Sequence, residues 1–378
     1  MHNPITVDGK TMSFFIRRPS NFHAHLRRDE LMRAIAKHLM RYVLYLLVMP
    51  NTGPIRTMAE ALAYYDELMA IARTEGLTKL VLIMTLYHTA DINAEAIEAM
   101  AKHAVTFAVK HYPPAKGATT GSGFSIPLDD PRSAYQLDAM AANGIRLLGH
   151  FEDVVDKYNR PLHPLAGEAH YIVNKLWRIR DRHPDLFISC EHASVRETVE
   201  FVKADPSGRT VLTATPQHSL CTEGDLKKSW GHLLKCKPFP QTEENRAVID
   251  DFITSGDFRA IAGDDTAAHL MSLKMAGFDK APFGAFWTWH SITAYAKVFE
   301  RANALHNLEK FVSLNGPRWW GLPEPANDDM VEIYRETVYD IPDPVPVPAL
   351  NDSVLPVGWS TEPDRLQIGW GIREKLVA

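Results

Sequence analysis

The sequence contains few cysteines: Cys190, Cys221 and Cys236 are the only ones among its 378 residues. They form no CxxC pair and no even-numbered framework, so a disulfide-stapled secreted domain and a cysteine-rich zinc module are both disfavoured. We expect three buried, reduced thiols and a cytoplasmic protein. Lys10 near the N-terminus is not followed by the apolar segment that a secretory signal contains, which supports the same expectation.

Long hydrophobic runs and an excess of basic residues are missing as well. The longest apolar run, residues 42–49, is far shorter than the roughly 20 residues that a membrane-spanning helix needs. With 41 basic and 46 acidic residues the formal charge is -5, so no basic surface for nucleic acid is expected. Hydrophobic content of 46% and charged content of 23% are typical of a globular protein. A small molecule is the expected partner, with neither nucleic acid nor membrane.

What the sequence does contain is a repeated alternation of apolar runs and helical segments. The runs predict eight strands, at 14–25, 42–49, 80–86, 106–109, 145–148, 186–189, 210–215 and 258–262. Near-continuous apolar strands separated by helices are typical of a parallel sheet covered on both faces. Eight such units predict an α/β fold of the (β/α)8 TIM-barrel class.

Local signals mark the connecting helices and the two ends of the chain. Thr57 with Glu60 predicts a capping box, Gly144 the C′ position that ends another helix, and Ser194 the cap of a third. The first 13 residues or so are expected to be a polar leader. We expect residues 1–322 to form the barrel with its terminal helices, and residues 323–378, which are rich in proline, to be a C-terminal extension packed on it.

Polar residues stand at the C-terminal ends of the predicted strands. They are His23 and His25 on the first strand, Lys110 on the fourth, His150 on the fifth, His192 on the sixth and Asp265 on the eighth. Each alone is better explained as an ordinary hydrogen-bonded residue, but strand ends share one face of a barrel, where catalytic residues gather. Two histidines one residue apart also project from the same side of a strand. Imidazole and carboxylate ligands suit zinc, so the joint pattern predicts a metallohydrolase.

These residues belong to a longer series of motifs that spans nearly the whole chain. In order they are NFHAHLR (21–27), VMPN (48–51), VKHYP (109–113), ATT (118–120), LGH (148–150), CEH (190–192), TPQH (215–218), GDD (263–265) with His269, SLNGP (313–317) and GLP (321–323). With them the chain resembles the dihydroorotases of the single-function bacterial type, in the amidohydrolase superfamily of metal-dependent barrels. The resemblance implies reversible cyclisation of N-carbamoyl-L-aspartate to L-dihydroorotate, a hydrolase reaction of de novo pyrimidine synthesis.

The resemblance also implies a metal centre with two Zn2+ ions per chain. The ligands would be His23, His25 and Asp265 for one zinc ion, His150 and His192 for the other, and Lys110 for both. Lys110 would be carboxylated to N6-carboxylysine, because a free ammonium cannot ligate, and a hydroxide would complete the bridge. Asp265 would in addition be the catalytic residue that carries the proton.

Six residues would contact the substrate by the same resemblance: Arg27, Asn51, Thr119, Thr120, His269 and Ala281. The planar guanidinium of Arg27 would bind the substrate carboxylate with two parallel hydrogen bonds, and Asn51 and His269 would be further carboxylate contacts. Ala281 would contact the ring through its backbone. Thr119 and Thr120 would form the tip of a loop, residues 113–123, that closes over the substrate. On the residues alone, Asn51 is interpreted as a turn residue after Pro50, and the threonines as part of a plain flexible loop. Family members are often dimers, so the resemblance allows a homodimer.

Three residues near the expected substrate depart from the family pattern: Phe151, Lys237 and Asp264. They leave a second hypothesis open, a paralogue of the same mechanism that acts on another carboxylated cyclic amide, because pocket shape and charge set discrimination. A third hypothesis is a non-catalytic barrel kept as a scaffold. The complete set of six metal-site residues argues against it, because a scaffold has no physical need for them.

Overall fold

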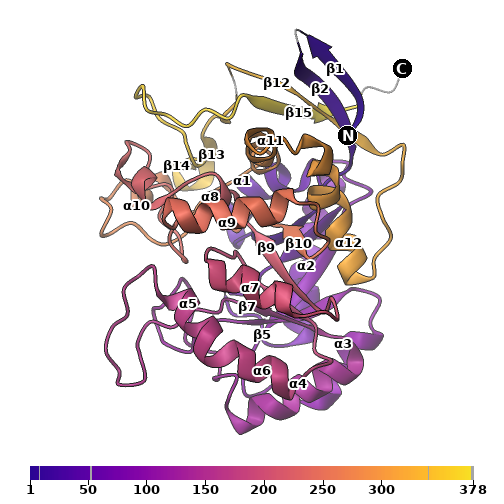
Figure 1. Ribbon diagram of the computed structural model, residues 1–378, viewed down its shortest axis with the longest axis vertical. Helices are drawn as coiled ribbons and strands as arrows, with labels where there is room; N and C mark the ends of the chain where they lie inside the picture. The colour runs from indigo at the N-terminus through magenta and orange to yellow at the C-terminus, as the bar shows by residue number, and fades with distance from the viewer. Residues whose placement is uncertain (8, 52, 339, 376–378) are drawn as a thin grey trace.

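The computed structural model describes residues 1–7, 9–51, 53–338 and 340–375. At its centre is a parallel sheet in the order β10-β9-β8-β7-β6-β5-β4-β3-β11 (Figure 1). The strands are β3 (Asn21–His25), β4 (Tyr45–Val48), β5 (Val81–Tyr87), β6 (Phe107–His111), β7 (Arg146–Gly149), β8 (Ile188–Cys190), β9 (Thr210–Ala214), β10 (Ala260–Ala262) and β11 (Thr266–Ala267). Each of the eight predicted strands contains or overlaps one of them.

The sheet closes on itself through a break in its last strand. Ala260 in β10 pairs with Leu212 of β9, whereas Thr266 in β11 pairs with Ala24 of β3. β10 and β11 are therefore two halves of one barrel strand, interrupted at residues 263–265. The predicted (β/α)8 TIM-barrel class is confirmed.

Alternation along the strands divides the core into two parts. In β4, Leu46 and Val48 belong to the cluster between the sheet and its helices, whereas Tyr45 and Leu47 belong to a second cluster inside the barrel. Successive side chains of a strand point to opposite faces, so a strand buried on both faces is apolar throughout. Trp319 and Trp320 complete the inner cluster.

Helices surround this sheet (Figure 1). They are α1 (Asp29–Met40), α2 (Met58–Thr74), α3 (Ala94–Lys102), α4 (Pro131–Asn143), α5 (Gly167–Tyr171), α6 (Trp177–Arg182), α7 (Arg196–Ala204), α8 (Pro216–Ser219), α9 (Glu243–Thr254), α10 (Met271–Lys274), α11 (His290–Arg301) and α12 (Asn315–Trp320). A π-helical turn, Ile172–Leu176, joins α5 to α6. None of the helices in the described part of the chain is long and apolar enough to cross a membrane.

Two of the three predicted helix signals are confirmed. Thr57 and Glu60 form the capping box of α2, and Gly144 ends α4 at a φ of 65°. The prediction for Ser194 is wrong, because α7 is preceded by Val195 and has no side-chain cap. The Ser194 hydroxyl donates instead to the buried carboxylate of Glu168.

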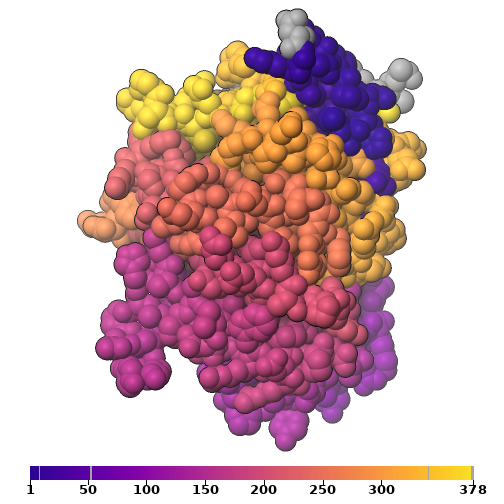
Figure 2. Space-filling view, in the orientation of Figure 1, coloured from indigo at the N-terminus to yellow at the C-terminus, as the bar shows by residue number. Residues whose placement is uncertain are grey.

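The two ends of the chain meet in a second, antiparallel sheet, in the order β1-β2-β12-β15. Its strands are β1 (His2–Val7), β2 (Lys10–Arg17), β12 (Met330–Arg335) and β15 (Trp370–Glu374), and a separate hairpin contains β13 (Val345–Val347) and β14 (Asp352–Val354). The expected polar leader is therefore two strands, and residues 14–16 belong to β2 rather than to the barrel. Figure 2 shows the N-terminal strands at the top of the molecule, close to C-terminal segments.

Candidate metal centre and active site

The strand-end residues converge at the C-terminal end of the barrel. His23 and His25 lie in β3 and Lys110 lies in β6, while His150 directly follows β7. The ring centroid of His192, just after β8, lies 5.1 Å from that of His23 and 4.4 Å from that of His150. The structure thus brings side chains from the first, fifth and sixth barrel strands together, as the sequence predicted.

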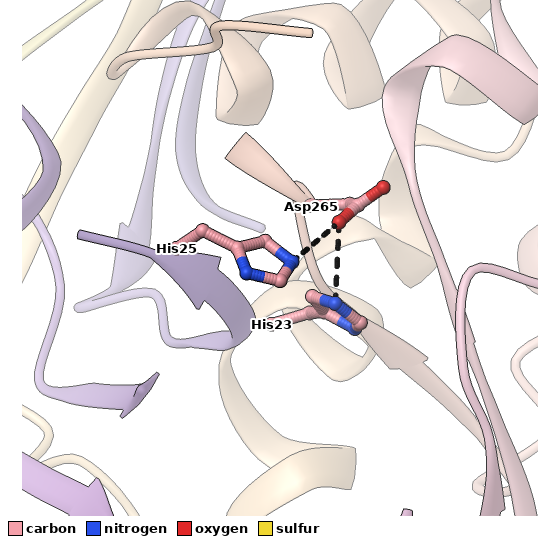
Figure 3. Close-up of side chains that lie close together, drawn as sticks. All are labelled: His23, His25 and Asp265. Atoms are coloured by element: carbon pink, nitrogen blue, oxygen red, sulfur yellow. Dashed lines mark hydrogen bonds and ion pairs between the residues drawn. The ribbon is translucent and has the colours of Figure 1, made fainter. Parts of the chain in front are cut away.

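His23 and His25 both approach one carboxylate oxygen (Figure 3). Oδ1 of Asp265 lies 3.2 Å from Nε2 of His23 and 3.1 Å from Nε2 of His25. A tetrahedral zinc site with bonds of about 2.0–2.1 Å has edges of about 3.3 Å between its ligand atoms. All three residues are buried, and their ligand atoms fit a single metal ion.

The other nitrogens of the two imidazoles are occupied. Nδ1 of His23 lies 2.5 Å from Oε2 of Glu191, and Nδ1 of His25 lies 2.6 Å from Oδ1 of Asn51. An acceptor on Nδ1 fixes the tautomer in which Nε2 keeps its lone pair, the arrangement found around metal-bound histidines. Both rings are therefore set to present Nε2 to a cation.

Lys110 is a fully buried amine. Among the described residues its Nζ has no hydrogen-bond partner, and it lies 5.3 Å from the centroid of the Tyr112 ring. Burial lowers the pKa of Lys110 to about 8. An unpaired buried ammonium is unfavourable, whereas a neutral amine reacts with CO2 to a carbamate whose oxygens can ligate. The surroundings of Lys110 thus fit a carboxylated lysine.

His150 and His192 form the other side of the site. Nε2 of His150 lies 2.8 Å from Oε2 of Glu152, whose second oxygen accepts from Nζ of Lys237 at 3.1 Å. Nδ1 of His192 is buried, with no hydrogen-bond partner among the described residues. Both rings border the pocket described below.

The backbone is strained at three site residues. Arg27, His192 and Asp265 have φ values of 62°, 44° and 48°, in the left-handed region that non-glycine residues rarely adopt. Each such residue costs on the order of 1–3 kcal/mol and persists where the surrounding structure holds it. Three of the eight described non-glycine residues with positive φ are thus residues of the predicted site, which agrees with a functional role.

A pocket opens over these residues. Its described lining consists of His23, His25, Arg27, Asn51, Tyr112, Thr119, Thr120, His150, His192, Cys236, Lys237, Asp265, Ala267, Phe283 and Gly284. Arg27 uses Nε to donate to the Ala268 carbonyl at 2.7 Å, and His269 Nε2 lies 3.1 Å from another guanidinium nitrogen.

The loop that carries Thr119 and Thr120 lies over this pocket. Nδ2 of Asn51 donates to the Thr120 carbonyl at 2.8 Å, and the Thr120 hydroxyl donates to the Phe283 carbonyl at 3.0 Å. Ala281 is different, because it is not among the described lining residues and its N–H donates to the Gly277 carbonyl at 2.9 Å. Five of the six predicted substrate residues thus line the pocket or contact a residue that does.

Of the three departures from the family pattern, Lys237 alone is among the described lining residues. The Phe151 ring stacks on Tyr171 with centroids 5.4 Å apart, and Asp264 accepts from the Thr266 N–H at 2.9 Å. Sequence reasoning missed the roles of Glu152 and Glu191, which bind the far nitrogens of His150 and His23. The position of Glu152 two residues after His150 is a signal that could have found its role, whereas Glu191 binds a histidine 168 residues away and its sequence neighbours do not indicate that contact.

No family model matches the chain. Curated relatives named dihydroorotase do: the protein of Yersinia pestis (strain Pestoides F) is 33% identical over 349 residues, which cover 90% of this chain and 94% of the relative. That of Picosynechococcus sp. (strain ATCC 27264 / PCC 7002 / PR-6) is 33% identical over 348 residues, with the same coverage.

Solved structures share the fold. The dihydroorotase of Saccharomyces cerevisiae in complex with 5-fluoroorotic acid has a TM-score of 0.83 at 23% identity and covers 97% of this chain and 100% of its own. The dihydroorotase of Campylobacter jejuni has a TM-score of 0.79 at 20% identity, with coverages of 96% and 98%. The L-hydantoinase (dihydropyrimidinase) of Arthrobacter aurescens reaches 0.65 at 15% identity, with coverages of 84% and 76%.

Proposed function

This chain belongs to the dihydroorotase family, and we propose that it is a zinc-dependent enzyme that interconverts N-carbamoyl-L-aspartate and L-dihydroorotate in pyrimidine synthesis. Members of the family are hydrolases that act on a cyclic amide C–N bond. The observation that carries the proposal is the convergence of His23, His25 and Asp265 within a chain that is similar to dihydroorotases over 90% of its length. A cytoplasmic location and a homodimer remain predictions.

The metal ligands that we propose are the six strand-end residues: His23, His25, Lys110, His150, His192 and Asp265. Lys110, as N6-carboxylysine, would be a ligand of both zinc ions, and its buried Nζ, which has no hydrogen-bond partner among the described residues, supports this assignment. Zinc bound here would supply a hydroxide near neutral pH and polarise the ring carbonyl. Glu191, Asn51 and Glu152 would hold three of the histidines in their orientation.

Asp265 is the proposed proton carrier. Its Oδ1 lies 3.2 Å from Nε2 of His23 and 3.1 Å from Nε2 of His25, and its Oδ2 lies 3.4 Å from Nε2 of Gln217. In ring opening it would take the proton of the attacking hydroxide and deliver it to the departing amide nitrogen. Cyclisation would use the reverse transfer.

Arg27 is the proposed binder of the substrate carboxylate. It is buried beside the pocket, and its Nε donates to the Ala268 carbonyl, which fixes the plane of the guanidinium. Asn51, His269 and the backbone of Ala281 are the proposed further contacts. Thr119 and Thr120 would exclude water from the reacting ring while the loop is closed.

A second candidate is ring opening of a different carboxylated cyclic amide, favoured by Lys237 in the pocket lining. Zinc-loaded protein given L-dihydroorotate, its five-membered isomer 5-carboxymethylhydantoin, or uncharged dihydrouracil separates the candidates. We expect kcat/KM for L-dihydroorotate to be at least about tenfold higher than for the other two compounds. One misplaced group in the pocket costs roughly 1–3 kcal/mol of transition-state binding. Preference for the isomer supports the second candidate. A protein that neither binds zinc nor opens any of the three rings would support the hypothesis of a non-catalytic scaffold.

A further inference from the structure

The carboxylate of Glu152 links the side chain of Lys237 to the proposed metal centre. Nζ of Lys237 lies 3.1 Å from Oε1 of Glu152, and Oε2 of the same carboxylate lies 2.8 Å from Nε2 of His150. The side chains of Glu152 and His150 are 2% and 4% exposed, and that of Lys237 is 12% exposed. The three groups form a continuous polar chain from the pocket wall to a proposed zinc ligand.

The segment that carries Lys237 is anchored to the barrel. Nε2 of His218 donates to the Pro238 carbonyl at 3.0 Å, and Nδ1 of His218 accepts from the Thr215 hydroxyl at 2.6 Å. The Lys237 Nζ also lies 5.0 Å and 5.8 Å from the ring centroids of Phe239 and Phe283. The backbone next to Lys237 is thus fixed by His218. The ammonium lies near two aromatic rings and donates to Glu152.

The Glu152 carboxylate has little freedom to turn. A Cβ on Gly167 would lie 2.7 Å from Cγ of Glu152, so the stem of this side chain packs directly on α5. The neighbouring Glu168 carboxylate is occupied by the Ser194 and Thr198 hydroxyls. With one oxygen on Lys237 and the other on His150, Glu152 fixes the orientation of the His150 ring and leaves Nδ1 for the pocket.

We propose that Lys237 is a positioning residue for the metal centre, which acts through Glu152 on the orientation of His150. The inference rests on the proposed function, because it takes His150 to be a zinc ligand. A buried carboxylate needs a cationic partner, and Nζ of Lys237, 3.1 Å from Oε1 of Glu152, supplies one. Lys237 thereby stabilises the ligand geometry instead of binding the substrate directly.

The test is a double-mutant cycle on zinc affinity. Lys237→Met removes the charge but keeps the stem, Glu152→Gln removes the carboxylate, and Lys237→Arg restores a cation. Zinc affinity is measured by competition with a chromophoric chelator, and the melting temperature of the zinc-free proteins reports any loss of folding. Lys227→Met is the matched control, because Lys227 is exposed and lies in the same connection between α8 and α9.

We expect Lys237→Met and Glu152→Gln each to weaken zinc binding by about tenfold to 100-fold, the usual effect of losing such a partner. The double variant should be no more than about threefold weaker than the weaker single variant, because both residues act through one contact. Lys237→Arg should regain most of the affinity, and Lys227→Met should match wild type. In steady state, Lys237→Met at equal zinc content should lower kcat with little change in KM.

Wild-type zinc affinity in Lys237→Met, with a raised KM alone, would overturn the proposal and make Lys237 a direct substrate contact. Additive losses in the double variant would overturn it as well, because the two residues would then act separately. A wild type that binds zinc but does not open L-dihydroorotate defeats the proposed substrate and leaves the zinc cycle as the test of Lys237. A wild type that binds no zinc overturns both proposals.

Discussion

Nδ1 of His25 donates a hydrogen bond of 2.6 Å to Oδ1 of Asn51. The donor is the imidazole, because Nδ2 of Asn51 already donates to the Thr120 carbonyl at 2.8 Å and Oδ1 is left as an acceptor. One amide thus joins a proposed zinc ligand to the loop over the pocket. The proposed metal centre and the loop over the pocket therefore share a residue.

Asn51→Ala should weaken both functions of this amide. Without an acceptor on Nδ1 the His25 ring loses its fixed tautomer, so we expect zinc affinity to fall by about tenfold to 100-fold. KM should rise too, because the loop loses its contact at Thr120. Chelator competition and steady-state kinetics check this, with Asn174→Ala as the control, since Asn174 is exposed and its Nδ2 donates to the His170 carbonyl four residues earlier. Unchanged zinc affinity would refute the role of Asn51 in orienting His25.

Lys110→Ala should remove zinc and activity together. The side chain is fully buried, and no other lysine belongs to the proposed ligand set. Zinc content by atomic absorption and dihydroorotate turnover are the measurements. Lys102→Ala, which removes an exposed lysine paired with Glu98, should behave as wild type. A Lys110→Ala protein with full zinc content and full activity would rule out the carbamate bridge.

Arg27→Met should act mainly on substrate binding. Hydrogen bonds to a charged group contribute about 1.5–3 kcal/mol, so KM should rise by roughly tenfold to 150-fold while zinc content stays constant. Arg27→Lys should recover only part of the loss, because an ammonium keeps the charge but lacks the planar fork. Saturation curves that are the same for Arg27→Met and wild type would show that the carboxylate binds elsewhere.

His88 should make the fold sensitive to acid. Its Nε2 donates to Oε1 of Gln136 at 2.8 Å, its Nδ1 lies 3.1 Å from Nδ1 of His111, and burial lowers its pKa to about 4. Because the unfolded histidine titrates near 6.5, the unfolded chain binds a proton that the folded chain excludes as pH falls from about 6.5 to 4. The free energy of unfolding should therefore decrease across this window, by up to about 3 kcal/mol from His88.

Urea unfolding of zinc-free protein at several pH values measures this dependence. His88→Leu should be less stable at neutral pH, because the polar atoms of Gln136 and His111 lose a partner, but its stability should fall less steeply with acid. His306→Leu, at an exposed histidine, is the control. Equal pH slopes for His88→Leu and wild type would contradict the assignment.

The barrel and the strand-end residues could be predicted because both depend on local patterns. Apolar runs mark strands buried on both faces, and a polar residue that directly ends such a run lies at the catalytic face whatever the details of packing. This pattern was sufficient to predict that His23, Lys110 and Asp265 lie at the C-terminal end of the barrel. The split of the last barrel strand into β10 and β11 leaves Asp265 at the same edge, so it did not disturb the prediction.

What could not be predicted depends on contacts between distant residues or on side-chain direction. β2 pairs with β12, some 300 residues away, and no local pattern in residues 10–17 predicts that pairing. Ser194 has the type and position of a helix cap, but the buried Glu168 competes for its hydroxyl. Which histidine nitrogen faces Glu191 or Glu152 is decided by ring orientation, which the order of residues does not encode.

Asp265 is proposed to carry a proton in a zinc-dependent opening of L-dihydroorotate. The most direct test is the initial rate of ring opening, followed by ultraviolet absorbance, for wild type and Asp265→Asn at equal zinc content. We predict turnover by the wild type that disappears on zinc removal and returns on reloading, and a kcat at least about 100-fold lower for Asp265→Asn, with unchanged circular dichroism. Equal rates for the two proteins would contradict the role of Asp265 as proton carrier. No turnover by the zinc-loaded wild type would contradict the proposed reaction itself.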